Sequence, residues 1–208
     1  MRPGESAGRN EQFALIKKLN DAGVTVFFDS PYRRIFYDKY DNYYQRLLEL
    51  ENVIITESFS KSVGLSGQRL GFIHTTNREL HDELEIRLMY CTNGVNAFAQ
   101  QLILRLLTTP TGIAAANAFK AATSRGIALN IEYLKQRGLL AEKFYHASTP
   151  TGIFVVVNRT EEELLAHRIG SVSLSFFTKS RKEEAAKYAR ICVSAPHDKF
   201  VEYFERLK

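Results

Sequence analysis

The sequence predicts an α/β protein, in which a mainly parallel sheet with helices is followed by a smaller α+β unit. Two observations support this class: stretches of helical periodicity alternate with short apolar runs, and the pattern changes character at about residue 120. A chain of 208 residues suffices for one large domain or two small ones. We therefore expect a sheet domain over residues 1–119 and a small C-terminal domain over 120–208.

The first domain begins with a helix and continues with buried strands. In "NEQFALIKKLNDAG" the apolar residues Phe13, Ile16 and Leu19 are spaced by three, and Gly23 follows where a helix would stop. The runs "VTVFFD" (24–29) and "NVIIT" (52–56) are almost continuously apolar, which is typical of strands covered on both faces of a parallel sheet. A third candidate strand is "RLGFIHT".

Helices are predicted next, over 77–107 with a break at "CTNGV" and over 114–136 after the turn cluster "TTPTG". The remaining chain alternates between the two kinds of element. Candidate strands are "GIFVVVN", "SVSLSFF" and "YARICVSA", and candidate helices are "TEEELLAHRIG" and "HDKFVEYFERLK". The interleaved charges of "KSRKEEAAKYAR" indicate a solvated helix face.

Composition narrows the classes of function. The net charge is only +5, and no basic stripe with interleaved aromatics is present, so a nucleic-acid partner is not expected. The two cysteines, Cys91 and Cys192, form neither a metal-binding spacing nor a disulfide framework, which fits a reducing compartment. No signal region and no run of about 18 apolar residues occurs, so we expect a cytoplasmic protein without membrane contact.

Polar side chains cluster at the ends of the predicted strands. Asp29 ends the first strand, Ser58, Ser60 and Lys61 follow the second, and Arg69 opens the third. Ligands of open α/β sheets bind at such an edge. If these strands are neighbours in the sheet, the three sites converge.

A lysine in this setting can form a Schiff base with an aldehyde, and pyridoxal 5'-phosphate (PLP) is the common aldehyde cofactor. Its ring nitrogen needs a carboxylate, its phosphate needs hydroxyl and guanidinium donors, and its ring oxygen benefits from a phenol. Asp29, Ser58 with Arg69, and Tyr32 could supply these groups in turn. The structural alternative is an exposed lysine in a Ser/Gly loop, with "DSPY" an ordinary turn.

The joint pattern resembles class I and II aminotransferases of fold type I. Three segments carry the resemblance in the family's order: "DSPYRRIFYD", "VIITESFSKSVGLSGQRLGF" and "YARICVSA". The motif Ser-x-Ser-Lys, a Gly-rich stretch and Arg-x-Gly is highly specific. The resemblance implies that Lys61 carries PLP and is catalytic, that Asp29 pairs with the pyridine nitrogen, and that Tyr32 meets the ring hydroxyl. It also implies that Ser58 and Arg69 hold the phosphate, with Ser60 a weaker candidate.

The resemblance also implies a substrate site. Arg190 in "YARICVSA" matches the family arginine that binds the α-carboxylate of the substrate, and its alternative is a surface arginine at the end of a helix. Arg87 in "EIRLMY" is a weaker candidate, for a second carboxylate reached from a partner subunit, and its alternative is a role on the helix surface. The implied reaction transfers an amino group between an α-amino acid and a 2-oxo acid. A lyase or decarboxylase of the same fold would use the same lysine and remains open.

The resemblance covers only the second half of the family. No candidate appears for the loop that cradles the phosphate or for the aromatic that stacks on the ring, and the family's Asn-Pro-x-Gly motif falls on "MRPG" with Met1 at the asparagine. The expected explanations are a truncated start, completion by another chain, or a non-catalytic remnant. We expect weak PLP binding and little turnover by the chain alone, and a homodimer only where the large domain is complete.

Overall fold

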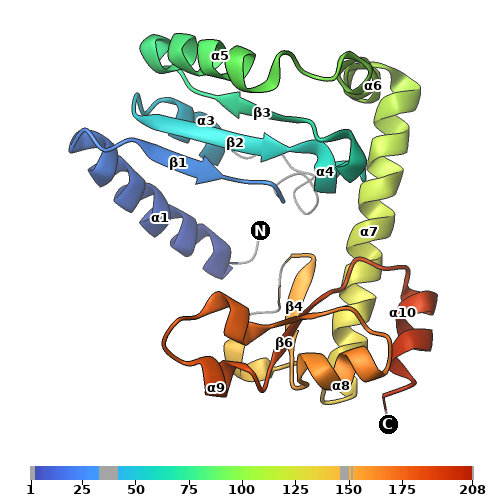
Figure 1. Ribbon diagram of the computed structural model, residues 1–208. Helices are drawn as coiled ribbons and strands as arrows, with labels where there is room; N and C mark the ends of the chain where they lie inside the picture. The colour runs from blue at the N-terminus through green and yellow to red at the C-terminus, as the bar shows by residue number, and fades with distance from the viewer. Residues whose placement is uncertain (1–2, 33–41, 146–149, 151, 208) are drawn as a thin grey trace. The chain divides into compact units, whose positions relative to one another are not determined.

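The computed structural model describes residues 3–32, 42–145, 150 and 152–207 (Figure 1). The chain divides into two compact units, Met1–Asn117 and Ala118–Lys208. Each unit has a three-stranded sheet of its own.

The sheet of the first unit is mixed. Its strands are β1 (Val26–Asp29), β2 (Val53–Ser58) and β3 (Gly71–His74), in the order β1-β2-β3. β1 and β2 run parallel, as predicted, but β3 runs antiparallel to β2, so the prediction of a mainly parallel sheet is wrong for this strand. A parallel return needs a long crossover, whereas the segment between β2 and β3 carries only one four-residue helix and a 3₁₀ turn.

Burial differs between the two parallel strands. β2 lies in the middle of the sheet, and Val53, Ile54 and Ile55 are buried on alternating faces, as its apolar run predicts. β1 lies at the edge of the described sheet, and the side chain of Phe27 is 64% exposed. The expectation of a strand covered on both faces therefore holds for β2 and is wrong for β1.

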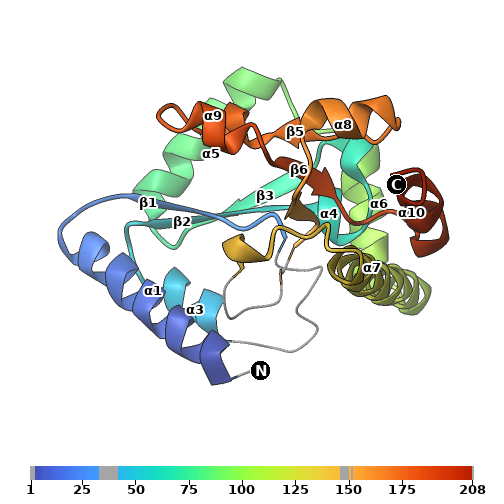
Figure 2. The ribbon, with the colours of Figure 1, turned by 90° about the horizontal axis from the view of Figure 1, so that it is seen from below.

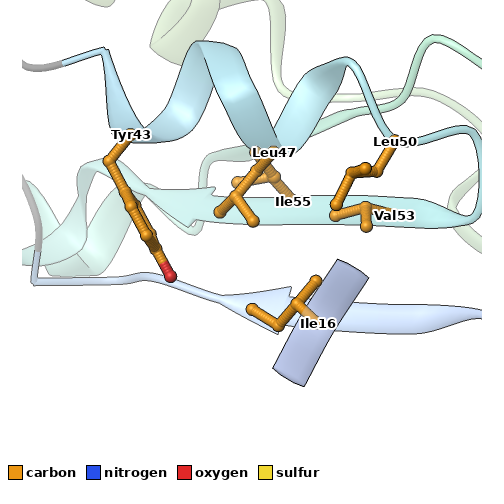
Figure 3. Close-up of a cluster of buried hydrophobic side chains, with 6 residues drawn as sticks. All are labelled: Ile16, Tyr43, Leu47, Leu50, Val53 and Ile55. Carbon is orange, nitrogen blue, oxygen red and sulfur yellow. The ribbon is translucent and has the colours of Figure 1, made fainter. Parts of the chain in front are cut away.

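Two helices cover one face of this sheet, α1 (Pro3–Asp21) and α3 (Tyr43–Leu48), as Figure 2 shows. The predicted periodicity of α1 brings Ile16 into the core, and Gly23 follows the helix with φ 75°. Helix α3 was not predicted from the sequence. The resulting cluster, drawn in Figure 3, comprises Ile16, Tyr43, Leu47, Leu50, Val53 and Ile55. Val53 and Ile55 are two residues apart, so they share one face of β2.

Three longer helices of this half are α5 (Arg78–Thr92), α6 (Ala97–Thr108) and α7 (Pro110–Gln136), and α7 continues into the second unit. The predicted breaks lie at the helix boundaries. Asn93, with φ 50°, ends α5, and Thr109 Oγ1 accepts from the amide of Gly112 at the start of α7. α6 and α7 meet at 90°, and a Cβ on Gly112 would lie 2.2 Å from the carbonyl oxygen of Arg105. This corner therefore requires a glycine.

The second unit has an antiparallel sheet of the order β4-β6-β5, with β4 at Phe154–Val157, β5 at Val172–Ser173 and β6 at Ala189–Cys192. Its short helices are α8 (Glu161–Ala166), α9 (Lys182–Ala185) and α10 (His197–Phe204). Two predictions were too long. "SVSLSFF" is a strand for two residues only and then a 3₁₀ turn, and the helix of "EEAAKYAR" stops at Ala185.

A buried amide joins three segments of the second unit. Asn130 of α7 is fully buried, and its Nδ2 donates to the carbonyl oxygens of Val193 (3.0 Å) and Ala195 (2.8 Å). Its Oδ1 accepts from Nδ1 of His197, 2.8 Å away at the start of α10. The segment that leaves β6 is thereby fixed to α7, because each polar atom of the buried amide has a partner.

Candidate functional site

The antiparallel direction of β3 brings the three predicted polar sites to one edge of the sheet. Asp29 ends β1 and is paired in register with Thr56, while Ser58 ends β2 and is paired with Gly71 at the start of β3. The last residues of β1 and β2 and the first of β3 therefore lie side by side (Figure 1). Arg69 directly precedes this start of β3, so the predicted convergence is found at this edge, by a route that a fully parallel sheet would not give.

The carboxylate of Asp29 is oriented by its neighbour in the sheet. Thr56 Oγ1 donates to Asp29 Oδ1 at 3.0 Å. Asp29 is exposed, and no other hydrogen bond to it is found among the described residues. Thr56 was missed in the sequence, although its place two residues before Ser58 in "VIITES" puts it on the same strand end. The arrangement leaves a fixed carboxylate with a second oxygen for a ligand.

Lys61 lies on a single helical turn, α4 (Phe59–Ser62), directly after β2. Ser58 caps this turn, because its Oγ accepts from the amide of Ser60 at 3.1 Å. Ser62 Oγ donates back to the carbonyl oxygen of Ser58 at 3.4 Å. Lys61 itself is half-buried. The serines of the motif thus shape the turn that presents the lysine.

A small apolar cluster holds this turn in place. Phe59 is buried with Leu70, Ala99 and Ile103, and its amide donates to the carbonyl oxygen of Leu70 at 3.1 Å. The loop from α4 to β3 is therefore pinned at both ends, on one side through Phe59 and on the other through Leu70. Sequence reasoning overlooked these two residues, whose apolar character within a Ser/Gly loop was the available signal.

Two special backbone positions complete the loop. Arg69 has φ 51° in the left-handed region, and its Nη1 donates to the carbonyl oxygen of Ser66 at 3.3 Å. A Cβ on Gly71 would lie 2.6 Å from the carbonyl oxygen of Glu57, closer than real side chains approach. Glycine is thus required where β3 passes the end of β2. The spacing Arg-x-Gly is therefore explained in part by the backbone, and not only by a ligand that the arginine could bind.

The other predicted residues lie outside this cluster of contacts. Tyr32 lies in the turn after β1 and is 36% exposed, with no hydrogen bond to the described residues. The rest of "DSPYRRIFYD" from Arg33 onward is outside the described residues. Arg87 of α5 pairs with Glu83 one turn earlier on the exposed helix surface, as expected for its alternative reading.

Arg190 belongs to the second unit, as the second residue of β6. It faces away from the buried side of the strand, because Ala189 and Ile191 are buried while Arg190 is half-buried. The alternative of a helix-end arginine is thus wrong, since the residue lies in the sheet.

Other kinds of site find no support in the part of the chain that is described. No group of three or more His, Cys, Asp or Glu side chains could hold a metal there. In that same part no one helix has the length and apolar character to cross a bilayer. Among the described helices, only α6 and α7 taken together are long and apolar enough, and this pair is bent by 90°.

Comparison with solved structures gives the same fold. The chain superposes on an aminotransferase from Mycobacterium tuberculosis with a TM-score of 0.76 and 18% identity, over 95% of this chain and 51% of that one. An aromatic aminotransferase from Pyrococcus horikoshii matches with a TM-score of 0.72 and 20% identity, over 93% of this chain and 52% of that one. An aspartate aminotransferase mutant from Thermus thermophilus matches with a TM-score of 0.72 and 17% identity, over 94% of this chain and 53% of that one. The chain thus spans about half the length of these structures.

Sequence comparison decides the family. A search of curated protein sequences finds no match. The model of aminotransferase classes I and II, however, matches residues 4–204, which is nearly the whole chain and includes both the sheet edge around Lys61 and the strand of Arg190. With the sheet-edge geometry and the fold in agreement, this protein belongs to the class I and II aminotransferase family.

Proposed function

We propose that this chain anchors PLP through Lys61 and serves the transfer of an amino group between an α-amino acid and a 2-oxo acid. The observation that carries the proposal is the meeting of Asp29, the Lys61 turn and the Arg69 loop at one sheet edge. The family uses PLP, which supports the assignment.

The residues at this edge fit the chemical needs of PLP. An oriented carboxylate, Asp29, suits a protonated pyridine nitrogen, and the amine of the half-buried residue Lys61 suits the aldehyde carbon. The phosphate would be held by the hydroxyl of Ser58, with Ser60 as a further donor, and by the guanidinium of Arg69, which retains donors beyond the one given to Ser66. The phenol of Tyr32 would meet the ring hydroxyl.

Each side chain then has a defined task. Bound PLP would supply an electron sink for the bonds at the substrate Cα. The amine of Lys61 would remove and return the proton at that carbon. Asp29 would keep the ring nitrogen protonated, because a carboxylate stabilises the charged form. Arg190 would bind the α-carboxylate of the substrate and so fix its orientation.

Covalent trapping tests the anchoring step directly. The purified chain is mixed with PLP, reduced with borohydride and digested, and the modified lysines are identified by mass spectrometry. We expect the label on Lys61, its loss in Lys61→Ala, and no change in Lys179→Ala, a variant of an exposed lysine. Equal labelling of surface lysines, with none favoured at position 61, would refute the proposal.

The reaction type needs a second measurement. Products are followed after incubation of the PLP-treated chain with L-alanine and 2-oxoglutarate, for which we expect low turnover by the chain alone. Pyruvate and glutamate as matched products support amino transfer. Release of carbon dioxide or of an eliminated fragment without amino transfer would instead favour a decarboxylase or lyase.

A further inference from the structure

The guanidinium of Arg190 is held by two aromatic rings. Its Cζ lies 4.4 Å from the ring centre of Phe154 and 4.5 Å from that of Phe177. Both distances are within the range of cation–π contacts. Across the described residues, no hydrogen bond or ion pair of this guanidinium is found, although the side chain is half-buried.

The register of the sheet explains this arrangement. Arg190 lies on the central strand β6, opposite Val156 on β4 and Val172 on β5. Phe154 is two residues from Val156 and therefore shares the face of Arg190, as its diagonal neighbour. Phe177 comes from the 3₁₀ turn that follows β5. The two rings thus reach the guanidinium from opposite neighbours of β6.

Such a contact holds the charged guanidinium in place but leaves its N–H donors without hydrogen-bond acceptors. An aromatic ring attracts the cation but supplies no acceptor oxygen, whereas a guanidinium has five N–H donors in a rigid fork. Without the rings, the long arginine side chain would populate several rotamers, and binding of a ligand would cost free energy because the side chain would then be restricted to one of them. With the rings, the side chain is already restricted before a ligand binds.

We infer that Phe154 and Phe177 are positioning residues, which hold the Arg190 guanidinium ready for a carboxylate. This inference rests on the proposed role of Arg190. The rings do not touch the reacting atoms and act only through the arginine. Phe177 is the better residue to change, because it is 49% exposed, whereas Phe154 forms part of strand β4.

The test is a nuclear magnetic resonance titration of the full chain with pyruvate, observed at the Nε–H of Arg190. The signal is assigned by its absence in Arg190→Lys. In Phe177→Leu we expect a downfield move of the side-chain protons of Arg190, through loss of one ring current, and an about 3- to 10-fold weaker affinity for pyruvate. Phe177→Tyr, which keeps the ring, should restore both.

The matched control is Phe176→Leu. Phe176 is the neighbouring residue, is 79% exposed and packs against Phe177, but makes no contact with Arg190 among those found. We expect this variant to leave the pyruvate affinity unchanged. Protection of the β4 and β6 backbone amides from hydrogen exchange should stay the same in all variants, which separates loss of positioning from loss of fold.

The outcomes separate the inference from the proposed function. If pyruvate does not shift the Arg190 signal, or if Arg190→Lys binds as tightly as the parent, the carboxylate role is wrong and the inference falls with it. If Arg190→Lys loses binding while Phe177→Leu binds like the parent, the carboxylate role stands and the positioning role is refuted. If Phe177→Tyr fails to rescue Phe177→Leu, the ring is not the cause and the inference is again refuted.

Discussion

Replacement of Asn130 by alanine tests whether one buried amide holds the second unit together. The side chain is fully buried and makes three hydrogen bonds, two to the carbonyl oxygens of Val193 and Ala195 and one from His197. In Asn130→Ala, all three bonds are lost, and the two carbonyl oxygens and the imidazole of His197 lose this partner. The segment after β6 and the start of α10 should loosen first.

The magnitude follows from the number of bonds. A hydrogen bond contributes about 0.5–1.5 kcal/mol net, so loss of three costs about 2–4 kcal/mol of unfolding free energy. His197→Ala removes only one of them and should cost about 1 kcal/mol. Lys135→Ala is the matched control, because Lys135 is an exposed residue of the same helix and should shift stability by less than about 0.5 kcal/mol.

Hydrogen exchange is the suitable assay, because it reports on each unit separately. Amides of β4 and β6 that exchange only through unfolding of their unit should lose protection by about 30- to 900-fold in Asn130→Ala. Peptides from β1 and β2 in the first unit should be unaffected. If Asn130→Ala matches Lys135→Ala in protection, the buried amide is not a tie and the reasoning is refuted.

Three further predictions concern single positions. Gly71→Ala places a Cβ 2.6 Å from the carbonyl oxygen of Glu57 and should cost about 1–3 kcal/mol by thermal denaturation, whereas Gly67→Ala, with no neighbour within 4 Å, should not; equal melting temperatures would contradict this. Burial raises the pKa of Tyr145 above the ordinary value of 10.0. The contribution of this phenol to the stability of the second unit should therefore be constant below about pH 10 and fall as the pH rises further. Urea titrations at several pH values should show that this contribution to the fall is absent in Tyr145→Phe. Thr160→Ala removes the capping box of α8 and should cost about 1 kcal/mol, seen as faster exchange in α8 amides and refuted by unchanged exchange.

The sequence predicted the elements well where local patterns determine them. The end of α7 at Gln136, the break at Asn93 and the alternation in β6 follow from capping and periodicity, which act over a few residues. The start of α7 was predicted four residues too late, at 114, because the turn residues of "TTPTG" already belong in part to the first turn of the helix. The candidate residues at the sheet edge were found because polar groups after apolar runs are visible in any one sequence.

The rest depends on contacts between distant residues. The antiparallel direction of β3 follows from the short path between the strands, and the exposure of Phe27 follows from the lack of a second neighbour beside β1 in the described sheet. The tie between Thr56 and Asp29 depends on strand register. Likewise, the rings around Arg190 come from two other segments of the chain. No periodicity in the sequence encodes these pairings.

The glycine at the start of β3 has one more consequence, for the length of the loop before it. Because only a residue without a Cβ passes the carbonyl of Glu57, Gly71 determines which residue of β3 lies opposite Ser58. Deletion of one residue from the loop would bring a bulky neighbour to that place and turn every side chain of β3 to the opposite face. The eight-residue interval between Lys61 and Arg69 is therefore constrained by the backbone, independently of any ligand.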